Sequence, residues 1–224
     1  MALHTAPAAR VRFGRPRAIF FSLAALLAPL AATITATAAD GQTIVRVEED
    51  WELVVGEPDT DTQSPQVTTV ISPVPSVDSI YAAFNLNHKT VPEYERGGMQ
   101  LQLWNADAAV ESAQLGGDTL LNAPAEVVRW TQQMHLDQGQ LEFEVVNGTS
   151  TTWGSFGDNH KLRGTITTSL TDLNGYNPAT SVENSGVGYA GNRVTSLVLK
   201  RVRTYSAQGL IAEDDSPKVV YPHD

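Results

Sequence analysis

The sequence contains no cysteine. This absence excludes disulfide bonds, thiolate metal sites, cysteine nucleophiles and lipid attachment through a thiol. The sequence also lacks the zinc motif H-E-x-x-H and the serine-hydrolase motif G-x-S-x-G. Beyond the N-terminal segment the histidines are widely scattered, at His88, His135, His160 and His223. We therefore expect a fold held by packing alone, and we identify no catalytic residue.

Basic residues are scarce. The chain has 15 Lys and Arg against 25 Asp and Glu, and four of the arginines lie within the first 17 residues. Beyond residue 38, 11 basic residues face 25 acidic ones, which gives a net charge of −14. A chain this acidic repels nucleic acid and anionic lipid, so we exclude nucleic acid as a partner.

Only one hydrophobic run is long. Residues 18–32 form an apolar stretch after four arginines, and the small-x-small pattern Ala36-Thr37-Ala38 follows it. We therefore expect residues 1–38 to be a secretory signal peptide and residues 39–224 to form a single domain that is secreted, periplasmic or on the cell surface. An uncleaved membrane anchor is the alternative, but Pro29 interrupts the run. We expect no membrane span after cleavage.

Residues 43–55 show a clear strand pattern. Val45, Val47, Trp51, Leu53 and Val55 alternate with charged residues, as in a strand with one buried face. Glu49 alone breaks the alternation. A single charge on the apolar face suggests an edge strand or a β-bulge.

The same alternation recurs along the chain. It predicts strands over residues 66–72, 79–87, 99–105, 126–136, 161–170, 193–206 and 219–221. Residues 126–136 should form a hairpin with the strand that begins at 141, and a change of phase within 193–206 indicates a bulge. Residues 106–122 permit one or two helical turns, and 172–191 is expected to be a long loop.

These elements predict an all-β fold. Short strands at regular spacing, with no long amphipathic helix, indicate an antiparallel two-sheet β-sandwich of the jelly-roll or concanavalin/lectin-like kind. No internal repeat points to a propeller or a solenoid.

The stretch 141–157 combines a strand, a turn and large aromatics. Leu141, Phe143 and Val145 alternate with Glu142, Glu144 and Val146, and Asn147-Gly148 is the pair that best tolerates a tight hairpin turn. Trp153 and Phe156 follow it. We expect these aromatics either to form a binding edge or to fill the core.

Glu142 and Glu144 lie two residues apart, so both carboxylates leave the same face of the strand. The run E-F-E-V-V-N loosely resembles the E-x-D-x-x-E strand of laminarinase-type glycoside hydrolases. That resemblance implies a two-carboxylate mechanism, but Asn147 stands where the family has its second catalytic Glu. We interpret the pair as the solvated face of a strand.

Exposed aromatics beside amides and acids make stacking platforms for sugars. Aromatics of this kind lie at predicted strand ends or in Gly-rich loops, and Trp104 is one of them. Our candidate ligand-binding residues are Trp153, Phe156, Asn159, Tyr176 and Tyr189. A structural calcium is left open as a cofactor, with Asp172, Asn174 and Asn177 as weak candidate ligands, although such residues also form turns.

The run 47–55, VEEDWELVV, followed by Pro58-Asp59 and by 65–67, resembles a family of uncharacterised secreted proteins of planctomycete bacteria. The segment 192–205 is similar to their C-terminal strand. The resemblance implies export and a bacterial source, but it implies no activity and carries over no functional residue.

Three hypotheses follow. The first is a non-enzymatic β-sandwich that binds a glycan or an envelope protein outside the cytoplasm, or that acts by structural association. The second is a glycan-active hydrolase on a lectin-like scaffold. The third is an appendage subunit that polymerises by strand addition, which requires an unpaired edge near residues 43–55. The sequence does not indicate the oligomeric state.

Overall fold

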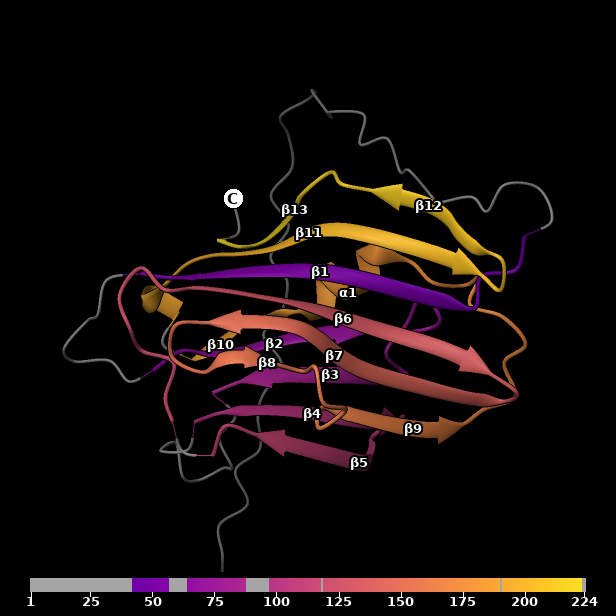
Figure 1. The fold of residues 1–224 in the computed structure, drawn as a ribbon, viewed down its shortest axis with the longest axis horizontal. Coiled ribbons are helices and arrows are strands. Elements are labelled where there is room, and N and C mark those ends of the chain that lie inside the picture. Colours follow the sequence, from indigo (N-terminus) through magenta and orange to yellow (C-terminus); the bar gives the residue numbers. More distant parts are fainter. Residues whose placement is uncertain (1–41, 57–63, 88–96, 118, 190, 223–224) are drawn as a thin grey trace, which may run out of the picture. The chain divides into compact units, whose positions relative to one another are not determined.

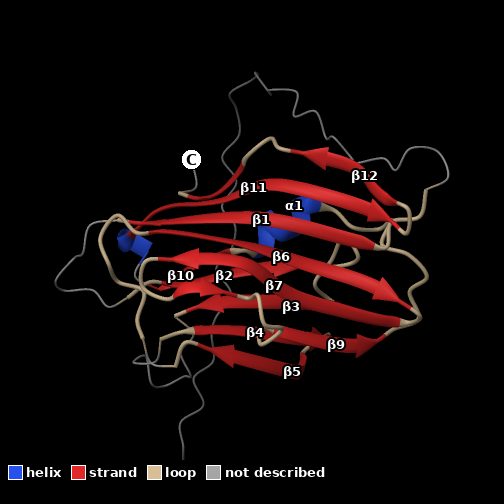
Figure 2. Ribbon diagram, in the orientation of Figure 1, coloured by secondary structure: helices blue, strands red, loops and turns tan. Residues whose placement is uncertain are grey.

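A computed structural model describes residues 42–56, 64–87, 97–117, 119–189 and 191–222. These residues form two antiparallel β-sheets, one of eight strands and one of five, which pack face to face (Figures 1 and 2). The chain is therefore an all-β sandwich, as the spacing of the short strands predicts.

The large sheet has the order β12-β11-β1-β6-β7-β8, with β13 paired to β11 and β9 paired to β7. Its strands are β1 (Arg46–Val55), β6 (Val127–Asp137), β7 (Gln140–Ser150), β8 (Gly154–Phe156), β9 (Arg163–Thr167), β11 (Val194–Ser206), β12 (Gly209–Asp214) and β13 (Lys218–Tyr221).

The small sheet has the order β10-β2-β3-β4-β5. Its strands are β2 (Gln66–Ile71), β3 (Ile80–Leu86), β4 (Met99–Asn105), β5 (Ala108–Leu115) and β10 (Gly186–Tyr189). In the sandwich β2 packs on β6, while β4 packs on β7 and β9. The β10 edge lies near β13, and the β5 edge lies near β9.

Apolar side chains of both inner faces fill the space between the sheets. Trp51 and Trp130 are register partners on β1 and β6, and their rings stack 6.4 Å apart. Phe84 of β3 meets the Trp130 ring edge-on from the other sheet, at 5.7 Å. The predicted inward set of residues 126–136 is buried, Gln132 included. The predicted hairpin between β6 and β7 is also present, with Asp137 opposite Gln140.

The small sheet covers only part of the larger one, and a short helix covers more. Helix α1 (Pro178–Asn184) packs on β2 and β13. Asn177 begins the helix, since its side-chain oxygen accepts the N–H of Ala179 at 3.0 Å, and Pro178 occupies the first turn. The 3₁₀-helix η1 (Gly191–Arg193) leads into β11.

Glu49 shows where one prediction was half wrong. Its strand, β1, is central, with β11 on one side and β6 on the other, so the edge interpretation fails. A bulge does interrupt the β1–β11 register between Asp50 and Trp51. The carboxylate points inward because α1 and the loop before it supply its hydrogen-bond donors, as described below. Full pairing of β1 also contradicts the strand-addition hypothesis at residues 43–55.

The predicted Asn147-Gly148 hairpin turn is wrong. Strand β7 continues through this pair to Ser150, and the chain reverses at residues 151–153. Asn147 does have a positive φ of 54°, but it lies in a bulge where β7 changes register against β6. The left-handed conformation that favours Asn in a turn serves equally well in a bulge.

The secondary structure of segments without strong apolar alternation was also predicted wrongly. Residues 108–115 form strand β5, although the alanines of 106–122 permit one or two helical turns. The expected loop 172–191 holds α1 and β10, and β12 was not predicted. These strands are short or mostly exposed, so little burial pattern marks them in the sequence.

A side chain binds one N–H on the free edge of β9. The N–H of Thr165 donates to the carboxylate of Glu111 on β5, at 2.8 Å. Glu111 therefore joins the two sheets at this edge.

Across the described ranges, no helix has the length and apolar character needed to cross a membrane.

Candidate functional site

Trp153 and Phe156 pack into the sandwich. Phe156 is 4% exposed, and its ring lies 6.5 Å from Phe84. Trp153 meets Phe156 at 88° and donates its indole N–H to the carbonyl of Thr119 at 3.1 Å. These aromatics were expected either to form a binding edge or to fill the core, and the geometry favours the second interpretation.

A buried carboxylate shapes the turn that precedes them. Glu126 accepts the hydroxyl of Ser150 at 2.5 Å and both the N–H and hydroxyl of Thr152, at 2.7 and 2.5 Å. Glu126 is 4% exposed, so its bonds serve the turn and not a solvent-facing site. Asn159 lies exposed after β8 and accepts the N–H of Lys161.

Tyr176 belongs to a buried polar cluster beneath α1. Its hydroxyl donates to Glu49 at 2.7 Å, the hydroxyl of Ser181 donates to the same carboxylate at 2.5 Å, and the indole N–H of Trp51 donates at 3.1 Å. Complete burial raises the pKa of Glu49 to about 7, although these three donors and Lys218 oppose the rise. Burial and the charge of Glu49 hold the pKa of Tyr176 well above its usual value. This cluster ties α1 to β1.

The candidate cation ligands each bond to the protein itself. Asp172 accepts the N–H of Asn174, Asn174 accepts the N–H of Ile44, and Asn177 caps α1. In the part of the chain that the structure describes, no three acidic or histidine side chains gather as a metal site requires.

Glu142 and Glu144 do share one face of β7, but they have different partners. Glu142 pairs with Arg163 on β9. Glu144 is 3% exposed, because His160 covers it at 2.6 Å and Gln133 donates to it at 3.0 Å. The expectation of a solvated pair therefore holds for Glu142 and is wrong for Glu144.

The outer face of the small sheet has a different character. We call its polar and aromatic side chains the amide–aromatic face: Gln66, Thr68, Tyr81, Asn85, Gln100, Gln102, Trp104, Ser112, Gln114 and Tyr189. They alternate with inward residues of the core on all five strands.

Two aromatics lie side by side at one end of this face. Tyr81 and Trp104 are direct partners on β3 and β4, their ring centroids are 6.0 Å apart, and their planes differ by 1°. Both are partly exposed. Burial and the charge of Asp107 raise the pKa of Tyr81, so its hydroxyl remains a donor at neutral pH.

Amides and hydroxyls fill the middle of the face. Thr68 donates to Asn85 at 2.6 Å, and Asn85 donates to Gln102 at 3.1 Å. Gln100 is 4% exposed, and its side-chain oxygen has no hydrogen-bond partner among the described residues. Tyr189, opposite Gln66, marks the far corner, so this candidate shares a face with Trp104.

Charge is nearly absent from the small sheet. Glu111 is the one charged residue in its five strands, and it faces inward, toward β9. The alternation Gln100-x-Gln102-x-Trp104 was the sequence signal for this face, opposite Met99, Leu101 and Leu103. It could not be combined with Tyr81 and Tyr189 before the strand order was known.

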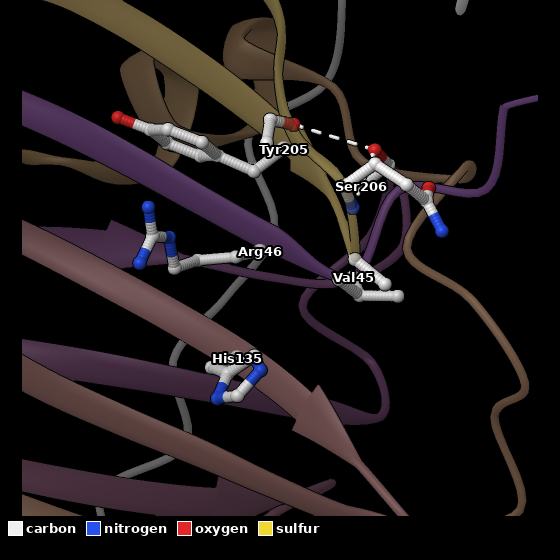
Figure 3. Close-up of a pocket in the computed structure, with 8 residues that line it drawn as sticks. Val45, Arg46, His135, Tyr205 and Ser206 are labelled. Atoms are coloured by element: carbon white, nitrogen blue, oxygen red, sulfur yellow. Dashed lines mark hydrogen bonds between the residues drawn. The ribbon is translucent and has the colours of Figure 1, made fainter.

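The outer face of the large sheet is densely charged. We call the charged face the outward side chains of β1, β6 and β11: Arg46, Glu48, Asp50, Glu52, Arg129, Lys200, Arg201 and Arg203. At one end, Arg46 stacks over the Tyr205 ring at 3.9 Å, beside His135, in a shallow depression of about 370 Å³ (Figure 3). A second depression, of about 430 Å³, lies between Asp50, Arg129 and Arg203.

Compared with family models, with curated proteins and with solved structures, the chain has no match, so the two faces themselves must carry the functional argument.

Proposed function

We propose that the protein is an exported, non-enzymatic module that binds a neutral glycan on the amide–aromatic face. One observation carries the proposal. In a chain with 18% charged residues, the five strands of the small sheet direct only uncharged polar groups, small apolar residues and aromatic rings outward.

The chemistry of the face suits a sugar. The apolar face of a pyranose packs on an aromatic ring, and Tyr81 and Trp104 offer two rings in parallel planes. Amides bind hydroxyls well because each has both donors and an acceptor. Gln102, which is partly exposed, places such an amide next to the rings.

The face also suits a chain of sugars better than a single ring. Tyr81 begins β3 and Gln66, opposite Tyr189, begins the antiparallel β2, so the aromatics stand at opposite ends. Outward rows on a strand repeat about every 6.7 Å, and three such steps span about 20 Å. An extended oligosaccharide could contact aromatic rings at both ends and amides between them.

Two expectations support an extracellular ligand. The N-terminal pattern predicts export, and the resemblance of residues 47–55 to secreted planctomycete proteins agrees with it. Both remain predictions. A protein partner from the cell envelope is the competing ligand class for the same face.

The hydrolase hypothesis receives less support. Glu142 and Glu144 are paired with Arg163 and His160 on the opposite outer face, and neither lines the two depressions described above. A retaining mechanism needs both carboxyl groups directed at one glycosidic bond.

Replacing Trp104 by alanine tests the proposal. We expect calorimetric titration of the wild-type protein to detect binding of at least one neutral hexasaccharide from a panel of β-glucan, xylan and mannan fragments. The Trp104→Ala variant should bind it about tenfold more weakly or worse, because one stacking ring is lost. Titrations with calcium and with a chelator show whether a cation contributes.

The matched control is Tyr205→Ala, which removes a partly exposed aromatic from the other outer face. It should leave the affinity for the neutral glycan unchanged. Equal affinity of Trp104→Ala and the wild type would place the ligand elsewhere. Binding of no neutral glycan in the panel would count against the function itself.

A further inference from the structure

The charged face is built from rows that cross three strands. Along β1, each outward residue has a neighbour on β6 and another on β11 in the same row. The rows centre on Arg46, Glu48, Asp50 and Glu52. Successive rows are about 6.7 Å apart, since the outward side chains alternate along the strand.

The carboxylates of these rows are already neutralised. Asp50 accepts Arg203 at 2.9 Å and Arg201 at 2.8 Å. Glu52 pairs with Arg129 at 2.7 Å and lies 3.6 Å from Lys200. Each of the two acids in the larger depression therefore has two basic neighbours.

Two of the basic groups, Arg129 and Lys200, are more exposed than the acids. The side chains of Arg129 and Lys200 are 60% and 45% exposed, whereas those of Glu52 and Asp50 are 19% and 20% exposed. Arg201 and Arg203 also pair with Glu213 and Glu48. The cations that a ligand meets first in the depression of about 430 Å³ are therefore Arg129 and Lys200, which share one acid, Glu52. Pairing alone does not require this excess in a chain that is otherwise strongly acidic.

Neutral hydrogen-bonding groups complete the lining. Thr131 and Asn147 border the same depression. Thr131 is 5% exposed and donates its hydroxyl to Asp50 at 2.7 Å, so the exposed amide of Asn147 is the neutral group open to a ligand. Arg46 covers the ring of Tyr205, so that ring is not a free stacking platform. The site thus offers cations for an anion and an amide for a hydroxyl, but no open aromatic surface.

We propose that this depression is a second binding site, which takes an acidic sugar of an anionic polysaccharide. A carboxylate or sulfate group binds between Arg129 and Lys200, and a ring hydroxyl binds the exposed amide of Asn147. A purely anionic polymer such as a nucleic acid lacks a match for the neighbouring acids, and the net charge of the chain opposes it. The proposal does not depend on the neutral glycan, because the two sites lie on opposite outer faces.

The test compares the binding of acidic and neutral oligosaccharides. Oligogalacturonate and a sulfated hexasaccharide are titrated into the purified protein, with a neutral hexasaccharide of equal length as reference. We expect at least one acidic oligosaccharide to bind, with an affinity that falls as sodium chloride rises from about 50 mM to about 500 mM. Lys200→Gln and Arg129→Gln should each weaken this binding about fivefold or more, and charge-assisted hydrogen bonds account for a loss of that size.

Lys161→Gln is the matched control, since it removes one exposed positive charge outside the depression. It should change the affinity less than twofold, which would exclude a general charge effect. The proposal fails if Lys161→Gln and Lys200→Gln weaken binding equally, or if neither acidic oligosaccharide binds. It also fails if hexaglutamate binds as tightly as the acidic sugars, because the site would then recognise negative charge and not the sugar.

Discussion

Replacing Gly148 by alanine is expected to destabilise the protein by about 3 kcal/mol, because a core cannot accommodate an added methyl group without moving its neighbours. A Cβ at this position would lie 2.2 Å from two ring carbons of Phe156. That ring cannot swing away freely, since it is buried against Phe84 and Trp153. The free energy of unfolding, measured in urea, gives the effect directly.

The matched control is Gly188→Ala on β10, where an added Cβ has no heavy atom within 4 Å. Its stability should stay close to that of the wild type. Adding Phe156→Leu to Gly148→Ala should recover part of the loss, because the smaller side chain makes room for the methyl group. Equal unfolding midpoints for the two alanine variants would show that Phe156 does not constrain Gly148.

The second large effect concerns Glu49 and pH. Its pKa is about 7 in the folded protein against 4.5 for an ordinary Glu, so folding takes up a proton between these values. The stabilisation linked to this proton is complete below pH 4.5 and is lost as pH rises through 7. The shift corresponds to about 3 kcal/mol.

The variant Glu49→Gln isolates this contribution, since it keeps one oxygen to accept hydrogen bonds from Tyr176 and Ser181. Relative to the wild type, it should gain about 3 kcal/mol between pH 4.5 and pH 8 in the free energy of unfolding. The pKa of Asp214 is lowered, chiefly by Lys218, so that group acts only below this range. A constant difference between the two proteins from pH 4.5 to 8 would mean that Glu49 stays ionised when buried.

Strands that bury one face could be predicted from the sequence, and strands that do not could not. β1 and β6 alternate almost without fault because their inward side chains fill the core. β5 and β12 are mostly exposed, so their positions follow from pairing with β4 and β11. Glu49 misled the prediction because two of its three donors, Tyr176 and Ser181, come from about 130 positions away.

The candidate site shows the same limit. Trp153, Phe156 and Tyr176 stand out in the sequence as aromatics near turns, but they pack or bond inside the sandwich. In the structure, Tyr189 lies on a face whose other members come from four different strands. Alternation indicates which face of a strand is exposed to solvent. It does not indicate which strands lie side by side, and a site on a sheet depends on both.

The carboxylate of Glu111 has a consequence for behaviour at high concentration. A sheet that ends in free N–H groups can extend into the sheet of another copy, which leads to aggregation. Glu111 occupies one such N–H, that of Thr165 on β9, and a bulge interrupts the register between β4 and β5, an edge strand of the small sheet. Both features oppose the joining of sheets between copies. Copies that crowd along a polysaccharide, as the proposed function requires, would thereby remain separate units.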